Sequence, residues 1–472
     1  MAMRRSLVGL LATLTLALIV PSTGCSRDDD AATTGSSGGG SGAGGTITIL
    51  WAQWPPSDHL QTLGQQYQKE TGTAVKVVQK SWSGAFGEAT QQEFKTNGQT
   101  YDIIVGDSQW IGQGVKGGHY VELTDFIKEN GELFKDVAPA AMKFYAEDPK
   151  GSGRYWGVPC EGDAMGWCYR KDLFEDPKHK EGFTKFLVSR GQIKQYELEP
   201  PKTWDQLLWI ARYFKEGSGV PDLAGVTMPT SRQYDTLLMM FQNVLWAFGG
   251  TYGDTTSGPK IDSPETQEAI AFFKQLLETS STGGRNQDYG AVASSYIAGN
   301  AAMCANFLGF FPQIDDPEQN KNYANKTGYF NMPAGPKGRF ASLGGQGLSI
   351  NAHIAPDRQA RAKEFLKWFA KPETQREWVK GKGCFTTNTA ILKSDAFKNA
   401  APYNPLFDEA FAMVNDFWSI AEFDPMLTVA QQQFSAIFQD NKDPKAAVKE
   451  IQTKWEQVLK DAGYMKQVAA AR

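Results

Sequence analysis

The segment YWGVPCEGDAMGWCYRKDLF, residues 155–174, is the part of the sequence on which the fold assignment depends. Its apolar and aromatic residues indicate a strand that stops, kinks through Glu161-Gly162-Asp163 and resumes. The kink carries two carboxylates, and Cys160 and Cys168 flank it. Acids and thiols in the middle of an extended crossing segment fit either an active site or a hinge beneath a ligand cleft.

The N-terminus indicates export from the cytoplasm. Arg4 and Arg5 precede a short apolar run, and Ser22-Thr23-Gly24 then leads to Cys25, so residues 1–24 have the pattern of a signal peptide. The Gly-Cys junction resembles a bacterial lipobox, and we expect a lipidated Cys25 that anchors a periplasmic or extracytoplasmic protein to the membrane. An ordinary cleaved signal is the alternative. Residues 25–45, rich in Gly and Ser, are expected to be a flexible tether.

The remaining chain is too long for a single core. Residues 46–472 exceed the usual size of one domain, so we expect two lobes. Lys and Arg number 48 against 52 Asp and Glu, a net charge of −4 that disfavours nucleic-acid binding. No apolar run after the signal is long enough to cross a bilayer, so we expect membrane attachment through the lipid alone.

The first part of the folded chain alternates strands and helices. Residues 46–51 and 74–80 have strand patterns, residues 60–71 and 87–98 have helical ones, and 101–107 is a short buried strand. This order predicts an α/β fold with a mainly parallel sheet, in which ligands bind beyond the carboxyl ends of the strands. Each strand is followed there by a tryptophan and a hydrogen-bonding side chain: Gln53 and Trp54, Ser81 and Trp82, then Asp107, Ser108, Gln109 and Trp110. The alternative is that these tryptophans cap the core.

The second part continues the pattern. Thr203 and Ser263 are expected N-caps of helices at 201–215 and 263–278. Strands are expected at 302–310 and 347–354, the latter reached through Gly344-Gly345-Gln346-Gly347. Further helices are expected at 358–369, at 372–379 and from about residue 446.

With these elements in order, the chain resembles the bacterial extracellular solute-binding proteins of the sugar-binding, maltose-binding-protein-like type, which serve ABC importers. The segments that carry the resemblance are YDIIVGD (101–107), residues 155–174, PKTWDQL (201–207), AAMCANF (301–307), residues 344–375 and AEFDPML (421–427). The resemblance implies the two-lobed periplasmic-binding-protein fold of type II, with hinge strands joining the lobes. The first lobe would comprise residues 46–162 and 338–382, and the second 163–337 and 383–472.

The resemblance also implies the ligand-binding residues. An acidic residue of the hinge holds sugar hydroxyls in this family, and Asp163 and Glu161 occupy that place. Asp107 follows the strand that commonly supplies a binding acid, whereas residues 306–311 replace a stacking tryptophan with phenylalanines. The expected set is Gln53, Trp54, Trp82, Asp107, Ser108, Trp110, Glu161, Asp163, Asn306, Phe310, Gly345 and Gln346 (in a turn), Trp418 and Glu422.

The function that follows is capture of a mono- or oligosaccharide and its delivery to the membrane permease of an ABC importer. We expect a monomer without catalytic residues, cofactor or metal. A polyamine is the alternative solute, since acids between aromatic rings would also suit an amine; glycerol phosphate and iron are less favoured. A glycosidase that uses Asp107 and Asp163 is the remaining rival and would need carboxyls roughly 5–9.5 Å apart.

Four cysteines remain beyond Cys25 in a compartment where disulfides form. Cys168 and Cys304 both fall on expected second-lobe strands, and Cys384 follows a helix that returns toward Cys160. We therefore expect disulfides 168–304 and 160–384, with four free buried thiols as the alternative. Structural zinc is disfavoured because the cysteine spacing and the four scattered histidines do not match a zinc pattern.

Overall fold

The computed structural model describes residues 45–82 and 84–467. The predicted signal peptide, the lipidated Cys25 and nearly all of the tether lie outside the described residues. These described residues belong to a single compact unit. Within the described part of the chain, every helix is too short or too polar to cross a bilayer.

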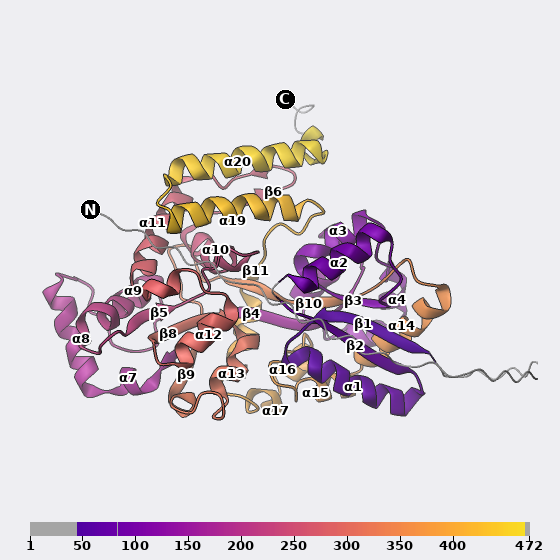
Figure 1. Cartoon of the computed structure of the whole chain (residues 1–472), viewed down its shortest axis with the longest axis horizontal. Helices are drawn as coiled ribbons and strands as arrows, with labels where there is room; N and C mark the ends of the chain where they lie inside the picture. Colours follow the sequence, from indigo (N-terminus) through magenta and orange to yellow (C-terminus); the bar gives the residue numbers. More distant parts are fainter. Residues whose placement is uncertain (1–44, 83, 468–472) are drawn as a thin grey trace, which may run out of the picture. The chain divides into compact units, whose positions relative to one another are not determined.

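A mixed sheet runs through this unit (Figure 1). Its strands lie in the order β2-β1-β3-β10-β4-β8-β5, with β9 paired to β4 and β11 paired to β10. The strands are β1 (Thr46–Ala52), β2 (Ala74–Lys80), β3 (Ile103–Asp107), β4 (Val158–Arg170), β5 (Ala224–Thr227), β8 (Ala301–Phe307), β9 (Thr327–Asn331), β10 (Ala341–Ile350) and β11 (Val414–Asn415), and β6 (Gly253–Asp254) and β7 (Gly258–Pro259) form a separate hairpin.

The predicted strand–helix alternation is confirmed at the N-terminal end. Strand β1 pairs in parallel with both β2 and β3, because the intervening helices return the chain to the same edge. Helix α1 (Pro55–Thr71) buries Leu60, Leu63 and Tyr67, the predicted apolar stripe, and ends at Gly72 in the left-handed conformation. The carboxyl ends of β1, β2 and β3 therefore share one edge of the sheet.

The segment around Glu161 differs from its prediction. Strand β4 runs without interruption for 13 residues, and the only irregularity is a register shift against β10. Gln346 pairs with Glu161 and Gly347 with Pro159, so Cys160 is the extra residue of a bulge. The expected kink at 161–163 is thus wrong, since ladder bonds to β10 on one side keep these residues extended.

Strand β4 is shared between two groups of strands. Its first half pairs with β10, which in turn pairs with β3, and its second half pairs with β8 and β9. All of these pairings are antiparallel, whereas β1, β2 and β3 on one side and β5 and β8 on the other run parallel.

The glycine-rich segment before the expected 347–354 strand is itself strand. Gly345 and Gln346 lie inside β10 rather than in the predicted turn. Gly345 has a φ of 87°, and a Cβ there would lie 2.2 Å from the carbonyl oxygen of Glu161. Only glycine allows β10 and β4 to approach so closely at this point.

Helices cover the sheet and extend beyond it (Figure 1). The N-caps Thr203 and Ser263 are confirmed, since each side chain accepts a backbone N–H of the first turn. Several predicted helix boundaries move: the helices expected at 60–71, 201–215, 358–369 and 372–379 are Pro55–Thr71, Trp204–Arg212, Pro356–Phe369 and Pro372–Trp378 in the structure. The remaining helices are α2 (Ala85–Thr96), α3 (Ile111–Lys116), α4 (Thr124–Glu129), α5 (Gly131–Phe134), α6 (Pro139–Tyr145), α7 (Lys171–Glu175), α8 (Pro177–Ser189), α9 (Trp204–Arg212), α10 (Thr236–Phe248), α11 (Pro264–Glu278), α12 (Tyr289–Ile297), α13 (Phe311–Asp315), α14 (Pro356–Phe369), α15 (Pro372–Trp378), α16 (Thr389–Leu392), α17 (Asp395–Lys398), α18 (Asn404–Ala412), α19 (Phe423–Gln439) and α20 (Pro444–Asp461).

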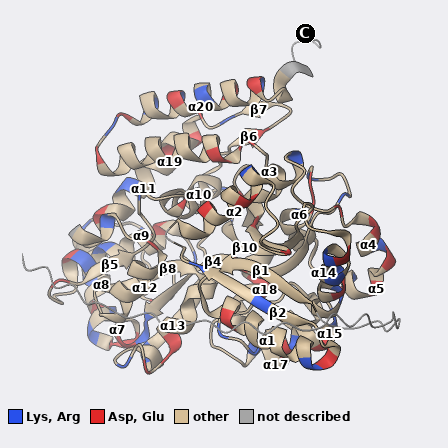
Figure 2. Cartoon of the chain, turned by 45° about the vertical axis from the view of Figure 1, so that its right-hand side comes forward, with Lys and Arg blue, Asp and Glu red and all other residues tan. Residues whose placement is uncertain are grey.

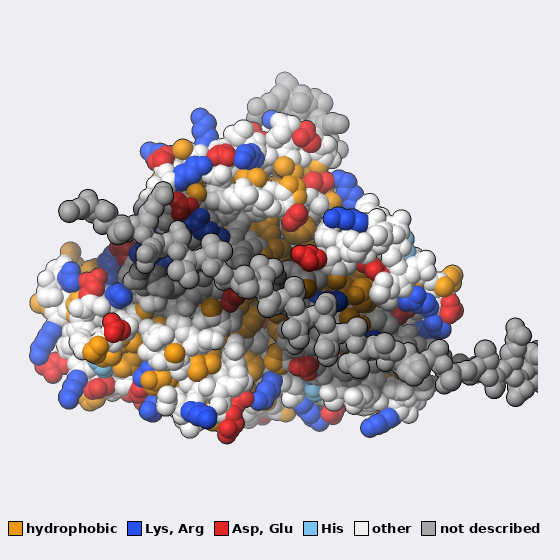
Figure 3. Space-filling model, in the orientation of Figure 1, with side chains coloured by type: hydrophobic (Ala, Val, Ile, Leu, Met, Phe, Trp, Pro, Cys, Tyr) orange, Lys and Arg blue, Asp and Glu red, His pale blue; other side chains and the backbone are white. Residues whose placement is uncertain are grey.

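Charged residues of both signs are interspersed in the views of Figures 2 and 3. Helices such as α20 carry both signs side by side (Figure 2), and Lys, Arg, Asp and Glu side chains of the described residues are scattered over the visible face (Figure 3). This distribution agrees with the low net charge and offers no basic stripe for a nucleic acid on that face.

Candidate functional site

The carboxylate of Asp163 joins the crossing strand β4 to the end of β8. Its Oδ1 accepts hydrogen bonds from the backbone N–H of Ala164 (2.8 Å) and of Gly309 (3.2 Å), and Gly309 also lies 3.3 Å from Oδ2. Gly309 belongs to the 3-10 helix η4 (Leu308–Phe310), which directly follows β8. The side chain is buried, and burial raises the pKa of Asp163 to about 7, although these N–H donors act in the opposite direction.

Trp54 borders the same glycine from the other side. A Cβ built on Gly309 would lie 2.8 Å from Oδ2 of Asp163 and 3.0 Å from Cζ3 of Trp54. The Trp54 ring packs edge-on against Trp82 (5.6 Å between centroids) and lies 6.5 Å from the ring of Phe310. Its buried Nε1 has no hydrogen-bond partner. A buried indole donor without a partner is a feature that a polar ligand would satisfy.

Asp107 ends β3 and is held by β10. The amide nitrogen of Gln346 donates to Oδ1 of Asp107 at 2.7 Å, because the two residues are opposite each other in the antiparallel ladder. Burial and the nearby carboxylate of Asp416 raise the pKa of Asp107 to about 6, although the hydrogen bond from Gln346 acts in the opposite direction. The amide oxygens of Gln346 and Gln109 are buried and lack hydrogen-bond donors.

Sequence reasoning missed a tyrosine–aspartate group at the start of α10. Nε1 of Trp110 donates to the Tyr234 hydroxyl at 3.0 Å, and the Tyr289 hydroxyl donates to Oδ1 of Asp235 at 3.1 Å. Burial and the charge of Asp107 raise the pKa of Asp235 to about 7. The ring of Tyr289 also stacks on that of Phe310, with centroids 5.6 Å apart.

These contacts form one connected set, which we call the aromatic–carboxyl cluster. Gly309 lies against both Asp163 and Trp54, and the ring of Trp54 is near that of Phe310. Tyr289 stacks on Phe310 and donates a hydrogen bond to Asp235. Burial and the charges of Asp107 and Asp416 raise the pKa of Asp235. The cluster consists of Trp54, Trp82, Asp107, Gln109, Trp110, Asp163, Tyr234, Asp235, Tyr289, Phe310, Gln346 and Asp416.

Seven of the 14 predicted ligand-binding residues belong to this cluster, and Ser108 adjoins it through its hydrogen bond with Asp416. The missed members do not follow long strands, so no strand-end pattern marks them. Tyr234 and Asp235 precede α10, Tyr289 begins α12, and Asp416 follows the two-residue strand β11. The aspartate directly before the apolar helix α10 was the one available signal.

The other predicted residues have different surroundings. Gln53 is exposed, and both side-chain amide atoms of Asn306 bond to the backbone, at Tyr289 and Phe307. Oε1 of Glu161 accepts the backbone N–H of Phe385 at 2.9 Å, and burial raises the pKa of this carboxyl. Trp418 packs edge-on against Trp455, and Glu422 forms an ion pair with Lys116.

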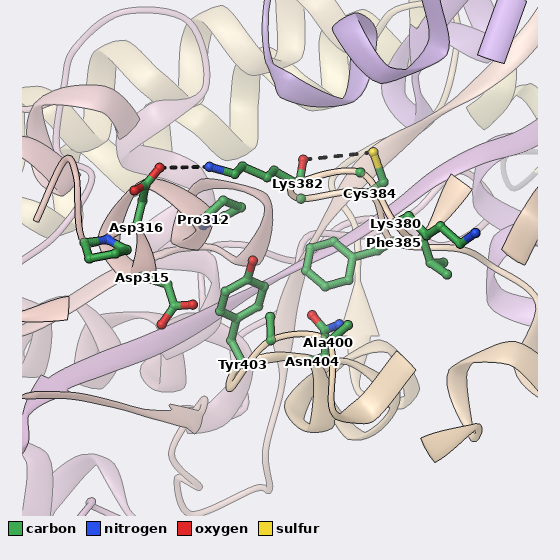
Figure 4. A pocket seen from close by; sticks show the side chains of 15 residues that line it. Pro312, Asp315, Asp316, Lys380, Lys382, Cys384, Phe385, Ala400, Tyr403 and Asn404 are labelled. Carbon is green, nitrogen blue, oxygen red and sulfur yellow. Dashed lines mark hydrogen bonds and ion pairs between the residues drawn. The ribbon is translucent and has the colours of Figure 1, made fainter. Parts of the chain in front are cut away.

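A separate cavity of about 280 Å³ is lined by none of the predicted binding residues (Figure 4), although its lining residue Phe385 donates its backbone N–H to Glu161. The end of α13, the segment 379–385 and the turn before α18 line it. Lys382 and Asp316 form an ion pair across its rim at 2.8 Å, and Cys384, Phe385 and Tyr403 lie along its wall. The lysines are largely exposed, so the ion pair contributes little to stability.

The four described cysteines are free, buried thiols, so neither expected disulfide is formed in the structure. The expected partners are nevertheless neighbours. Cys168 and Cys304 face each other across the β4–β8 ladder, and the pKa of the Cys384 thiol is raised by burial and by nearby Glu161 and Cys160. The pairing 168–304 and 160–384 therefore stays a prediction.

The sheet order and the helices that cover it define an α/β periplasmic-binding-protein fold. A family model described as bacterial extracellular solute-binding protein matches residues 53–376, and the chain belongs to this family. It is a family of solute-binding proteins rather than of enzymes, so the glycosidase alternative is excluded. Within the described residues, no group of three or more His, Cys, Asp or Glu side chains is placed to hold a metal ion.

Three known proteins illustrate the similarity. A probable amino-acid ABC transporter periplasmic-binding protein of Sinorhizobium fredii is 21% identical over 86% of this chain and 88% of its own length. An ABC transporter solute-binding protein from Agrobacterium radiobacter in complex with ribitol has a TM-score of 0.74 at 23% identity, covering 88% of this chain and 99% of that one. A maltose-bound protein from T. maritima has a TM-score of 0.74 at 22% identity, covering 89% and 100%.

Proposed function

We propose that the protein is the sugar-binding component of an ABC importer, which captures a mono- or oligosaccharide and delivers it to a membrane permease. The observation that carries this proposal is the aromatic–carboxyl cluster, in which ring faces and hydrogen-bonding groups alternate around Gly309. An aromatic ring covers the C–H face of a pyranose, while carboxylates and amides bind the hydroxyls at its rim. Trp54 and Phe310 supply the rings, and Asp163 and Gln346 supply polar atoms.

Polar atoms without partners support a hydroxyl-rich solute. Trp54 offers an N–H donor, whereas Gln109 and Gln346 offer acceptors, all of them buried. A sugar hydroxyl both donates and accepts, so a polyol matches such a mixed set. The ligands of the two similar structures, ribitol and maltose, are compounds of this kind.

Solute capture would involve closure of two lobes, 46–162 with 338–382 against 163–337 with 383–472. Several contacts join these parts: Trp110 with Tyr234, the Ser419 hydroxyl with the carbonyl of Ser108 at 2.7 Å, and Lys116 with Glu422. Hinge closure of this kind would bury the solute between the lobes. Lipidation of Cys25 would keep the protein beside its permease.

The proposal is tested with a ligand screen of the soluble domain by thermal shift and calorimetry. Mono- to tetrasaccharides and polyols form the main arm, with polyamines and amino acids as the other arms. At least one sugar should raise the melting temperature, since a ligand stabilises the folded state in proportion to its affinity. Trp54→Ala should remove that shift, whereas Trp209→Ala, on the distant helix α9, should leave it. Stabilisation by polyamines or amino acids alone would contradict the proposal.

A further inference from the structure

Three carboxyl groups of the cluster lie within electrostatic reach of one another without a matching positive charge. Asp107 comes from the end of β3, Asp235 precedes α10 and Asp416 follows β11. Each pair is close enough that one carboxylate raises the pKa of another, and burial acts in the same direction on all three. In the ligand-free protein, ionisation of these groups is therefore unfavourable.

Countercharge from the protein is sparse. None of the ion pairs among the described residues includes Asp107, Asp235 or Asp416. Among the three carboxyls, Lys150 lowers the pKa of Asp416 alone. Its Nζ donates to the backbone carbonyls of Phe144 and Glu147 instead of to a carboxylate. Burial lowers the pKa of Lys150 to about 8.

The polar groups around the carboxyls also include hydrogen-bond acceptors that lack donors. Because the amide nitrogen of Gln346 is fixed on Asp107, its oxygen remains as a buried acceptor without a donor. The amide oxygen of Gln109 is likewise a buried acceptor without a donor. An alkyl ammonium brings three N–H donors and no acceptor, whereas a hydroxyl brings one donor and two acceptor lone pairs.

Two tyrosine hydroxyls lie near the carboxyls. The hydroxyl of Tyr289 donates to Asp235, and the hydroxyl of Tyr234 accepts from Nε1 of Trp110, while burial and the charges of Asp107 and Asp235 raise the pKa of Tyr234. A hydroxyl oxygen can also accept a hydrogen bond from an ammonium group. Tyr234 adopts a φ of 46°, a strained backbone that holds its ring at this place.

We propose that the solute is a sugar that carries a protonated amine, with the ammonium group in the field of Asp107, Asp235 and Asp416. This inference rests on the proposed sugar-binding function and specifies its substrate class. A metal ion does not meet the need, since the described residues offer no group of three or more ligating side chains close enough to hold one. A neutral sugar would leave the three carboxyls uncompensated.

Matched ligand pairs provide the test. Glucosamine, galactosamine and mannosamine, with the β-1,4-linked dimer and trimer of glucosamine, are compared by calorimetry with the parent neutral sugars. The amine member of at least one pair should bind about 30-fold more tightly, as a charge-assisted hydrogen bond in a buried site would give. That advantage should fall about tenfold in Asp235→Asn and stay unchanged in Asp125→Asn, a control on the exposed face of α4.

The outcomes separate this inference from the proposed function. If neutral sugars bind as tightly as their amine partners, sugar binding stands and the amine assignment is overturned. If no sugar of either kind binds, both are overturned, and binding of spermidine would then identify the carboxyls as a polyamine site. Salt provides a second readout, since the amine advantage should shrink as ionic strength rises even if Asp235→Asn fails to fold.

Discussion

Gly309→Ala perturbs the candidate site with the smallest possible change in chemistry. The new Cβ would lie 2.8 Å from Oδ2 of Asp163, closer than real Cβ atoms approach other heavy atoms, and 3.0 Å from Cζ3 of Trp54, which is a tight contact. No functional group is removed, so any loss of binding must come from displacement. The Trp54 ring is confined by its edge-on contacts with Trp51 and Trp82, which leaves the carboxylate of Asp163 as the group that shifts.

The magnitude follows from the hydrogen bonds that hold Asp163. Its contacts with the Gly309 N–H, at 3.2 and 3.3 Å, are near the upper limit for hydrogen bonds. A displacement of about half an ångström takes both beyond that limit. A carboxylate displaced this far would also lose one charge-assisted hydrogen bond to the solute, which is worth about 1.5 kcal/mol, so we expect solute affinity to fall about tenfold.

Isothermal titration with the best-bound sugar of the screen measures this change. Gly131→Ala is the matched control, because its Cβ would meet open space at the start of α5. The control should bind like the wild type. An affinity of Gly309→Ala within twofold of the wild type, with the protein folded, would refute the placement of Asp163 and Trp54 at the solute.

The other predictions concern binding, pH, closure and the thiols. Trp110→Phe removes the donor to Tyr234 and should weaken solute binding several-fold by calorimetry, and Asp163→Ala should weaken it more; unchanged affinity in both would remove these residues from the site. Because the folded-state pKa values of Asp107, Asp163, Asp235 and Asp416 are raised to between about 6 and about 7, the free energy of unfolding of the solute-free protein should be highest near pH 4 and fall as pH rises to 8, by roughly 1–3 kcal/mol per group. Urea denaturation should show this slope and a flatter one for Asp416→Asn; a rise in stability over the same range would contradict the burial of these groups. Small-angle scattering should give a smaller radius of gyration with saturating solute, and an identical profile would indicate a rigid site. Non-reducing peptide mapping of protein exported to an oxidising compartment should find 168–304 and 160–384, whereas a 160–168 bridge would disagree with the extended geometry of β4.

The residues that the sequence located correctly are those whose position follows from local pattern. Asp107 ends β3 and Trp54 follows the end of β1, so their place at one sheet edge could be predicted from the strand–helix alternation before any long-range contact was known. Asp163 was predicted from the family resemblance. Its carboxylate is buried in the crossing strand and accepts a hydrogen bond from Gly309, more than 140 residues further along the chain.

The predictions failed where strand pairing or tertiary packing determines the local structure. Glycines near Glu161 and at 344–347 suggested a kink and a turn, but each lies in a strand because the partner strand approaches closely there. Tyr234, Asp235 and Asp416 meet Asp107 only through packing of α10 and the segment after β11. The proximity of these residues depends on tertiary structure, and a local sequence pattern does not predict it.

The uninterrupted strand β4 has a consequence for how the protein folds and unfolds. Its residues complete the hydrogen-bond ladders of strands on both sides, so removing either group would expose the edge of the other. The two groups are thus not separable modules that could melt one after the other, as domains joined by a loop often do. Thermal denaturation of residues 46–472 should be a single cooperative event, and a chain broken within β4 should yield two fragments that fold only when both are present.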